Sequence, residues 1–205
     1  MVYGLVRTGD ITFRLPSLPK FAKPTPPPPK QVLDTKPFGV TTNYPSLTAT
    51  DHMSGRRNAA YRIVTYIDYD CEQCKEAYQL LQKFLTERKG DTALIVRHFP
   101  LDVHPQARAK AIVAECIAQR DGEEAFWAYT DRLLTSDQGD DTMVEECAES
   151  RDIVRRLRAD NQSASQYGIG GLPALYLINT KTKKALFAVG VLTVKQLHEL
   201  VRQTK

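Results

Sequence analysis

Residues 61–74 read YRIVTYIDYDCEQC, and this stretch decides the fold. Residues 61–69 form an apolar run rich in β-branched and aromatic residues, which is typical of a buried strand. The motif Cys71-x-x-Cys74 follows at the start of a helical pattern. Unpaired N–H groups and the dipole at a helix N-terminus stabilise a thiolate, so Cys71 is expected to have a low thiol pKa. The stretch therefore predicts a strand, a helix and thiol redox chemistry where they meet.

Two other uses of a Cys-x-x-Cys motif fit this chain less well. In a structural zinc site the motif supplies half of the ligands, but the remaining cysteines, Cys116 and Cys147, are isolated from one another. A purely structural disulfide between Cys71 and Cys74 would close a loop too short to restrict the unfolded chain much. Redox exchange is therefore the favoured interpretation, and no metal site is expected.

From residue 59 onward the sequence alternates between strand and helix patterns. A helix from Cys71 to about Lys89 has apolar residues spaced three and four apart, and Gly90 ends it. A buried strand over 92–99 follows. The remaining elements are helices over 106–119, 123–134, 142–149 and 151–167, strands over 173–178 and 184–189, and a helix from the cap Thr193 to Val201. The order is β-α-β, then a helical block, then β-β-α, which predicts an α/β fold.

The first 58 residues differ in composition from the rest. Residues 16–37 hold 8 of the 12 prolines, which favours an extended polyproline II spacer. Residues 1–15 fit either a short hairpin or a disordered tail, and residues 38–58 are polar and rich in turn formers. We therefore predict a possible hairpin or tail over 1–15, a Pro-rich linker and irregular segment over 16–58, and a single domain over 59–205.

Charge and hydropathy exclude several function classes. The net charge is +4, but residues 1–58 hold 8 Lys or Arg against 3 Asp or Glu, whereas residues 59–205 hold 20 against 21. The predicted domain is thus nearly neutral, which argues against nucleic acid as a partner. No run approaches the roughly 18–20 apolar residues of a membrane span. No secretory signal is visible, although a signal or membrane anchor removed from a longer form remains open.

Four segments carry a family resemblance: residues 68–74 (DYDCEQC), 97–107 (RHFPLDVHPQA), 125–127 (AFW) and 167–174 (YGIGGLPA). Together they resemble the DsbA-like thiol-disulfide oxidoreductases of the thioredoxin superfamily. The resemblance spans about 59–202 and implies a thioredoxin fold (βαβ…ββα) with a helical insertion over about 106–167, behind a Pro-rich N-terminal extension. The chain departs from the family pattern at Glu72-Gln73, at Leu172 before the loop proline, and at Thr65.

The resemblance also implies roles for individual residues. Cys71 is expected to be the more exposed attacking thiol, and Cys74 the buried thiol that resolves the mixed disulfide. Glu72 is expected to raise the pKa of Cys71, and Gln73 offers only neutral hydrogen bonds, which predicts a weaker oxidant than relatives with a histidine there. A cis Pro173 would let Leu172 offer its backbone to a substrate strand.

Other polar residues and cysteines receive less specific predictions. Cys116 and Cys147 are either two core cysteines or a structural disulfide, and an oxidising compartment favours the disulfide. His98 and His104 are expected to be structural rather than catalytic. Asp68 lies close to the cysteines and is expected to face solvent or cap the helix.

The sequence thus predicts a periplasmic or extracytoplasmic thiol-disulfide oxidoreductase. Its partners would be protein thiols and disulfides, or a membrane redox partner, and its redox group would be the Cys71–Cys74 disulfide without a metal or organic cofactor. Two alternatives stay open: a disulfide reductase or isomerase on the same fold, and a non-catalytic thioredoxin-like interaction module in a membrane-associated complex. Residues 1–37 are a candidate segment for self-association.

Overall fold

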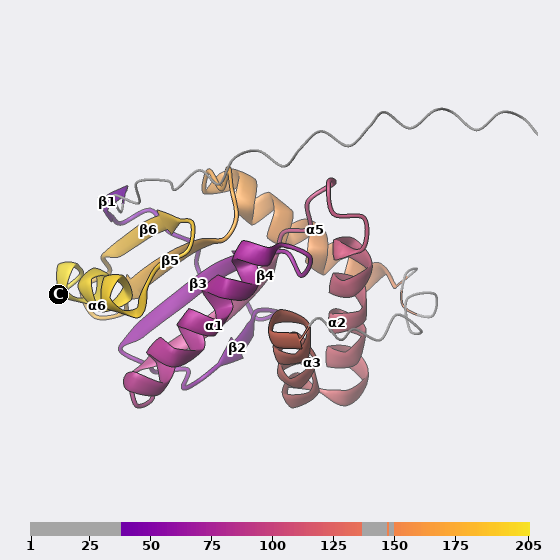
Figure 1. The fold of residues 1–205 in the computed structure, drawn as a ribbon, viewed down its shortest axis with the longest axis horizontal. Helices are drawn as coiled ribbons and strands as arrows, with labels where there is room; N and C mark the ends of the chain where they lie inside the picture. The colour runs from indigo at the N-terminus through magenta and orange to yellow at the C-terminus, as the bar shows by residue number, and fades with distance from the viewer. Residues whose placement is uncertain (1–37, 137–146, 148–149) are drawn as a thin grey trace, which may run out of the picture. The chain divides into compact units, whose positions relative to one another are not determined.

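The computed structural model describes residues 38–136, 147 and 150–205. The predicted N-terminal hairpin and Pro-rich spacer lie outside these residues, as does the predicted helix over 142–149 apart from Cys147. The described part contains a mixed six-stranded sheet in the order β1-β6-β5-β3-β4-β2 (Figure 1). The strands are β1 (Phe38–Thr41), β2 (His52–Ser54), β3 (Tyr61–Ile67), β4 (Thr92–His98), β5 (Ala174–Asn179) and β6 (Ala185–Val189).

The centre of the sheet is β3. It runs parallel to β4 from Tyr61 opposite Thr92 to Ile67 opposite His98, and antiparallel to β5 on its other side. Because it is paired along both edges and covered on both faces, β3 needs apolar residues at nearly every position, and six of its seven residues are buried. The register also brings the end of β3 next to the beginning of β5, which places the two loops that follow and precede them at one end of the sheet.

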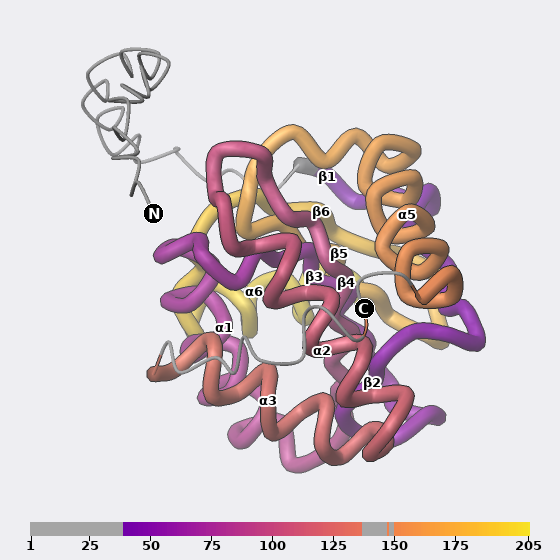
Figure 2. The backbone as a smooth tube through the Cα atoms, turned by 90° about the vertical axis from the view of Figure 1, so that its right-hand side faces the viewer, coloured from indigo at the N-terminus to yellow at the C-terminus, as the bar shows by residue number. Residues whose placement is uncertain are grey.

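Alternate strand residues separate into two apolar clusters, one on each face. Ile63, Leu94 and Leu177 pack with helices α1 (Glu72–Glu87) and α6 (Val194–Gln203), whereas Val64 and Ile95 face α5 (Arg151–Gln166). Figure 2 shows α1 and α6 on one side of the sheet and α5 on the other. The helices α2 (Ala107–Asp121) and α3 (Glu123–Ser136) pack against each other and join the first cluster.

The structure confirms the predicted order of elements from residue 59 onward. The unit β3-α1-β4 is followed by helices between 107 and 166 and then by β5-β6-α6, which is the expected thioredoxin fold with a helical insertion. Gly90 ends the turn after α1 with φ +83. Thr193 caps α6 through a capping box with Gln196. Among the described residues, no helix is both long and apolar enough to cross a membrane.

The expectation of an irregular segment over 38–58 was wrong for two short strands. β1 pairs antiparallel with β6, and β2 pairs antiparallel with β4. Both lie at the edges of the sheet, where a strand is paired on one side only and needs few apolar residues. Their three and four residues carry too little periodicity to be recognised locally. These strands widen the predicted four-stranded core on both sides.

Candidate functional site

Cys71 and Cys74 are free thiols that meet at the N-terminus of α1. Cys71 is the N-cap residue, and its sulfur accepts a hydrogen bond of 3.2 Å from the backbone N–H of Cys74. The Cys74 thiol donates to the Cys71 sulfur, with 2.6 Å between the two Sγ atoms. Cys71 is 5% exposed and Cys74 is 0% exposed. The pair is therefore close enough to exchange with a disulfide, and Cys71 is the less deeply buried of the two cysteines.

The two thiols differ in acidity. Hydrogen bonds from the Cys74 thiol lower the pKa of Cys71, and the Cys74 backbone N–H adds to this, while burial opposes it. The pKa of Cys74 is raised because its thiol would lose that hydrogen bond on ionising and because it is buried. The first proton to leave therefore comes from Cys71.

Glu72 and Gln73 point away from the pair toward solvent. The Glu72 side chain is 85% exposed and lies 2.9 Å from the ammonium of Lys75. Water and this cation screen its charge. The pKa of Cys71 is lowered, chiefly by the hydrogen bond from the Cys74 thiol, so the raised pKa expected from Glu72 is not the outcome.

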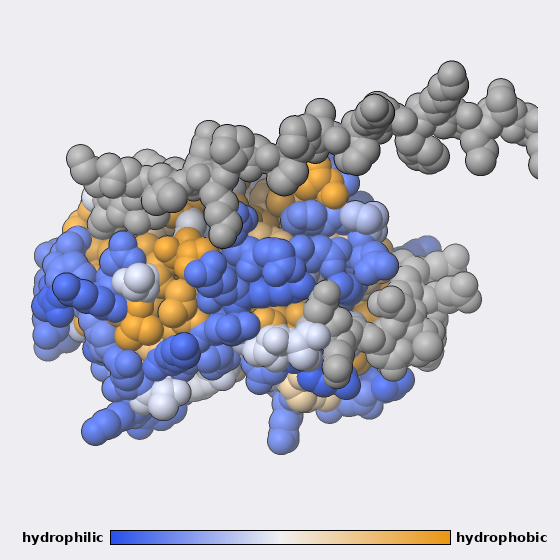
Figure 3. Space-filling model, in the orientation of Figure 1, coloured by the Kyte–Doolittle hydropathy of each residue, from blue (hydrophilic) through white to orange (hydrophobic). Residues whose placement is uncertain are grey.

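Leu172 and Pro173 lie at the same end of the sheet as the cysteines. The peptide bond between them is cis, and β5 begins at the next residue, directly opposite Tyr66. The Thr65 hydroxyl donates to the carbonyl of Ala174 over 3.1 Å, so Thr65 fastens β3 to β5 here. Apolar surface is exposed between α1 and the strands β5 and β6 (Figure 3). A small apolar pocket beside Pro173 is lined by residues of these elements and of α6, among them Ala77, Leu81, Leu192 and Leu197.

Asp68 neither faces solvent nor caps the helix, contrary to expectation: its side chain is 0% exposed, and the N-cap of α1 is Cys71. It accepts hydrogen bonds from the backbone N–H groups of Asp70 and Leu101, at 2.7 and 2.8 Å, and lies 2.8 Å from Nδ1 of His104. The loop after β4 folds back over the end of β3 and brings these groups together. Sequence reasoning missed this pair because its members are 36 residues apart, and the proximity of Asp68 to the cysteines was the only available signal.

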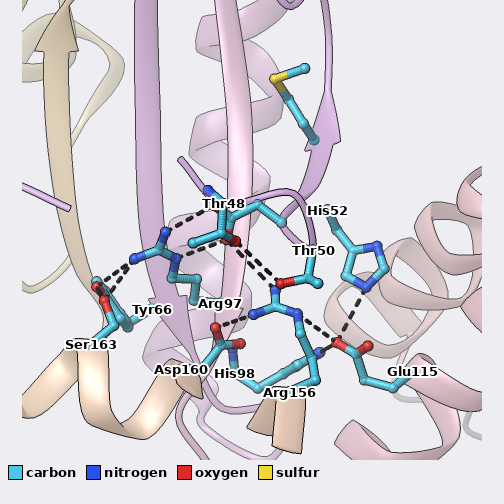
Figure 4. A network of polar contacts seen from close by, with 12 residues as sticks. Thr48, Thr50, His52, Tyr66, Arg97, His98, Glu115, Arg156, Asp160 and Ser163 are labelled. Atoms are coloured by element: carbon cyan, nitrogen blue, oxygen red, sulfur yellow. Dashed lines mark hydrogen bonds and ion pairs between the residues drawn. The ribbon is translucent and has the colours of Figure 1, made fainter. Parts of the chain in front are cut away.

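A second polar cluster lies away from the cysteines and joins several elements (Figure 4). Arg97 forms two hydrogen bonds to Asp51, at 2.9 and 2.8 Å, and Arg156 pairs with Asp160. The Glu115 carboxylate lies between His52 and His98, at 3.2 and 2.9 Å. All of these side chains are buried. His98 thus joins β4 to α2, in the structural position expected for it.

Within this cluster, hydrogen bonds and opposite charges offset the cost of burying each charged side chain. Burial opposes the charge on His52, but hydrogen bonds and attraction from Glu115 and Glu123 raise its pKa. Burial likewise opposes the charge on Glu115, but the two histidines hold its pKa well below the usual range. We therefore regard the cluster as a group of mutually compensated charges that fastens the segment before β2 to the rest of the domain.

Cys116 of α2 and Cys147 are joined by a disulfide, with their Cα atoms 5.8 Å apart. Each is 6% exposed. The bond links the first helix of the insertion to a residue just before α5. Both cysteine pairs are buried, so exposure alone does not distinguish the disulfide from the Cys71–Cys74 pair.

Comparisons with known proteins agree with this geometry. A family model described as thioredoxin matches residues 47–188. Pseudomonas aeruginosa DsbA2 superposes with a TM-score of 0.65 and 25% identity, over 77% of this chain and 95% of that one. The catalytic domain of Proteus mirabilis ScsC gives 0.62 and 23%, over 77% and 90%. A periplasmic thioredoxin-like protein from Salmonella enterica gives 0.60 and 19%, over 75% and 89%.

The curated proteins with similar sequences are named as Na(+)/H(+) antiporters. The chain is 36% identical over 85 residues to the Na(+)/H(+) antiporter NhaA 3 of Salinispora tropica, which covers 41% of this chain and 12% of the antiporter. It is 30% identical over 145 residues to NhaA 1 of Salinispora arenicola, covering 62% and 21%. The chain therefore spans only about an eighth to a fifth of the length of these two relatives.

Proposed function

We propose, from the premise that this chain belongs to the thioredoxin family, that it exchanges disulfides with protein substrates through Cys71 and Cys74. A thiol-disulfide oxidoreductase is the activity that fits both the DsbA-like fold and the thiol pair. The observation that carries the proposal is the asymmetry of that pair: one partly accessible thiol of lowered pKa above one fully buried thiol of raised pKa.

The exchange proceeds in two thiolate attacks. When the pair is oxidised, a substrate thiolate attacks Cys71, the Cys71–Cys74 bond breaks, and Cys74 leaves with the electron pair. A second substrate thiolate then attacks the substrate sulfur that is bonded to Cys71 in the mixed disulfide. The substrate disulfide forms, and Cys71 leaves as a thiolate. The substrate gains a disulfide and loses two electrons, and the pair gains them. The reverse sequence reduces a substrate disulfide, beginning with attack by the Cys71 thiolate.

Substrate would approach along the loop that holds Leu172 and Pro173. The Leu172 backbone lies before the first residue of β5, where an extended peptide can add main-chain hydrogen bonds. No metal or organic cofactor enters this scheme, because the disulfide itself carries the electrons.

An extracytoplasmic location and a membrane redox partner belong to the same proposal. The fold is shared with a protein described as periplasmic. A buried Cys116–Cys147 disulfide also fits an oxidising compartment, where such bonds persist. Self-association through residues 1–37 stays a prediction, since these residues lie outside the described part of the chain.

Trapping of a mixed disulfide tests the proposal. Reduced Cys74→Ser protein, in which nothing resolves the adduct, should retain a disulfide-linked insulin chain through Cys71. The matched variant Cys71→Ser should retain none, because its remaining Cys74 is buried and has a raised pKa. Equal trapping by the two variants, or none by either, would contradict the assigned roles.

The equilibrium potential against glutathione then separates the two directions of electron flow. A value near about −120 mV, as in DsbA, would identify an oxidant that introduces disulfides. A value near about −270 mV, as in thioredoxin, would identify a reductant or isomerase.

A second candidate function follows from the curated relatives. Because the chain matches part of two Na(+)/H(+) antiporters, it could serve as a thioredoxin-like interaction module beside a membrane transporter. Co-purification with an antiporter of the same cell, unchanged in the Cys71→Ser/Cys74→Ser variant, would favour this candidate. Co-purification that requires the cysteines would favour disulfide exchange.

A further inference from the structure

The turn that carries Cys71 is bonded to a histidine from another loop. Asp68 follows β3 and precedes Cys71 by three residues, and its carbonyl accepts the Cys71 N–H over 3.2 Å. Its buried carboxylate lies 2.8 Å from Nδ1 of His104. The same oxygen accepts the N–H of Leu101, in the loop that bears His104. One carboxylate therefore fixes the backbone before Cys71, the loop after β4 and the imidazole.

These contacts assign the hydrogen-bonding roles of the two nitrogens of His104. A buried carboxylate that accepts two backbone N–H groups is an acceptor, so Nδ1 of His104 keeps its hydrogen and donates it to Asp68. The other nitrogen, Nε2, makes no hydrogen bond to any residue that the structure describes. The imidazole is 28% exposed. Nε2 is therefore the ring nitrogen that stays available while the bond to Asp68 holds the ring in place.

Several charged groups surround Cys71, and the imidazole of His104 is one of those that act on its thiol. On α2, Lys110 lies 2.5 Å from the carboxylate of Asp70. On α1, Lys75 pairs with the exposed Glu72, and Cys74 contributes its thiol. Asp68 acts on Cys71 as an anion and His104 as a cation, the first raising and the second lowering the pKa of the thiol. With a neutral imidazole, the Asp68–His104 pair carries one negative charge. With a protonated imidazole it carries none.

We propose that His104, held in position by Asp68, supplies the positive charge that stabilises the Cys71 thiolate. It would take the place of a cationic group that the Glu72-Gln73 dipeptide does not provide. The proposal rests on the proposed function, since it concerns the thiolate that attacks or leaves during exchange. His104 acts on the sulfur through its charge, whereas Asp68 positions the imidazole and opposes the thiolate with its own negative charge.

The test measures the Cys71 thiolate directly, without a protein substrate. The rate at which iodoacetamide alkylates Cys71 is followed against pH in the reduced protein and in four variants: His104→Gln, Asp68→Asn, the double variant of these two, and a control. In His104→Gln the alkylation curve should move to higher pH, and a shift of one unit lowers the rate below the midpoint about tenfold. The matched control is His198→Gln, which removes a histidine paired with Glu87 on the surface and should leave the curve unchanged.

A double-mutant cycle separates positioning from charge. If Asp68 positions the imidazole, His104→Gln should shift the curve much less in an Asp68→Asn background than in the parent chain. An equal shift in both backgrounds would contradict the positioning role of Asp68. No shift in either background would overturn the proposal as a whole.

A measurement on the unaltered protein guards against variants that do not fold. Coupling between two groups is reciprocal, so a thiolate at Cys71 must favour protonated His104. The His104 imidazole resonances should therefore titrate at higher pH in the reduced protein than in the Cys71–Cys74 disulfide form, and identical titrations would contradict the coupling. Failure of insulin trapping with these shifts intact would reject the proposed function alone.

Discussion

At the scale of single residues, reactivity follows from what each thiol can bond to when it ionises. Cys71 stands at the helix N-cap, where the N–H and the thiol of Cys74 both point at its sulfur. Cys74 lies one turn inside the helix and is fully buried, and it would lose its hydrogen bond to Cys71 on ionising. Two chemically identical side chains thereby acquire opposite changes in pKa. The residues between them, being exposed, make a smaller contribution.

We predict that Glu72→His makes the Cys71–Cys74 disulfide more oxidising. An imidazolium at this position would stabilise the thiolate and hence the reduced form. Since the side chain at this position is 85% exposed, the change should stay below about 30 mV, which corresponds to tenfold in the equilibrium constant. Equilibration with glutathione measures it. An unchanged or more negative potential would contradict this electrostatic explanation.

A second prediction at this scale concerns His52 and pH. Its folded pKa is raised above 6.5, so its contribution to stability is fully present below pH 6.5 and is lost as pH rises through the folded value. The pKa values of Asp51 and Glu115 are lowered in the folded state, so pH affects their contributions in the opposite direction. Asp51 contributes stability above pH 3.8 and Glu115 above pH 4.5, and both contributions are lost as pH falls. The raised pKa of buried Asp160 partly offsets this loss at low pH.

Stability should therefore decline above pH 6.5, with a slope of at most about 1.4 kcal/mol per pH unit from His52. Urea denaturation at several pH values measures this slope. The variant His52→Gln should flatten the decline, whereas the surface variant His198→Gln should retain it. A decline of the same slope in His52→Gln would assign the pH dependence to other groups.

At the scale of the element, short strands are fixed by polar contacts rather than by their own sequence. The segment before β2 carries Asp51, whose carboxylate also accepts the N–H of Thr48 over 2.7 Å. Through Arg97 this carboxylate joins the segment to β4. Met53 of β2 donates its N–H to Glu123 of α3 over 2.9 Å. These bonds hold a three-residue strand at the edge of the sheet.

We predict that Asp51→Asn lowers the free energy of unfolding by about 3–5 kcal/mol, because it leaves the buried Arg97 guanidinium without its anion. The control is Asp152→Asn, which breaks an exposed pair with Arg155 in which the side chains are 68% and 76% exposed. That change should cost less than about 1 kcal/mol. Urea denaturation measures the loss of unfolding free energy in both variants. Equal losses would contradict the larger effect predicted for the buried pair.

At the scale of the whole molecule, a disulfide crosslinks two parts of the helical insertion, and polar contacts join the insertion to the sheet. The Cys116–Cys147 disulfide closes a loop with a sequence separation of 31 residues. The Arg156–Asp160 pair of α5 reaches β4, since Asp160 accepts the His98 N–H over 2.9 Å. The redox pair stands at the end of the sheet, on α1, apart from the disulfide. Stability and redox activity should therefore be separable.

We predict that Cys116→Ala/Cys147→Ala lowers stability by roughly 3–4 kcal/mol, the loop-entropy value for a closed loop of this length. The Cys71–Cys74 potential should remain unchanged. Alkylation of the native oxidised parent protein, followed by mass measurement, should find no free thiol at Cys116 or Cys147. Two free thiols there would reject the disulfide.

The sequence was sufficient to predict those elements whose signal lies within a few neighbouring residues. The apolar run over 61–69, the three-and-four spacing after Cys71, the stop at Gly90 and the cap at Thr193 each depend on neighbours within a few residues. From these signals the order of elements and the redox motif at the start of a helix could be predicted. The bounds of β3 and α1 differ from the predicted ones by two residues or fewer.

The tertiary structure alone decided which distant polar groups meet. Asp68 and His104 are 36 residues apart, and Asp51 and Arg97 are 46 apart. Nothing local in either segment encodes such a partner, because the pairing depends on how loops fold back over strand ends once the apolar core has formed. The amino-acid sequence by itself therefore determined the fold and the thiol pair. The folded chain decided the charge that surrounds that pair, since electrostatic environment depends on spatial proximity and burial.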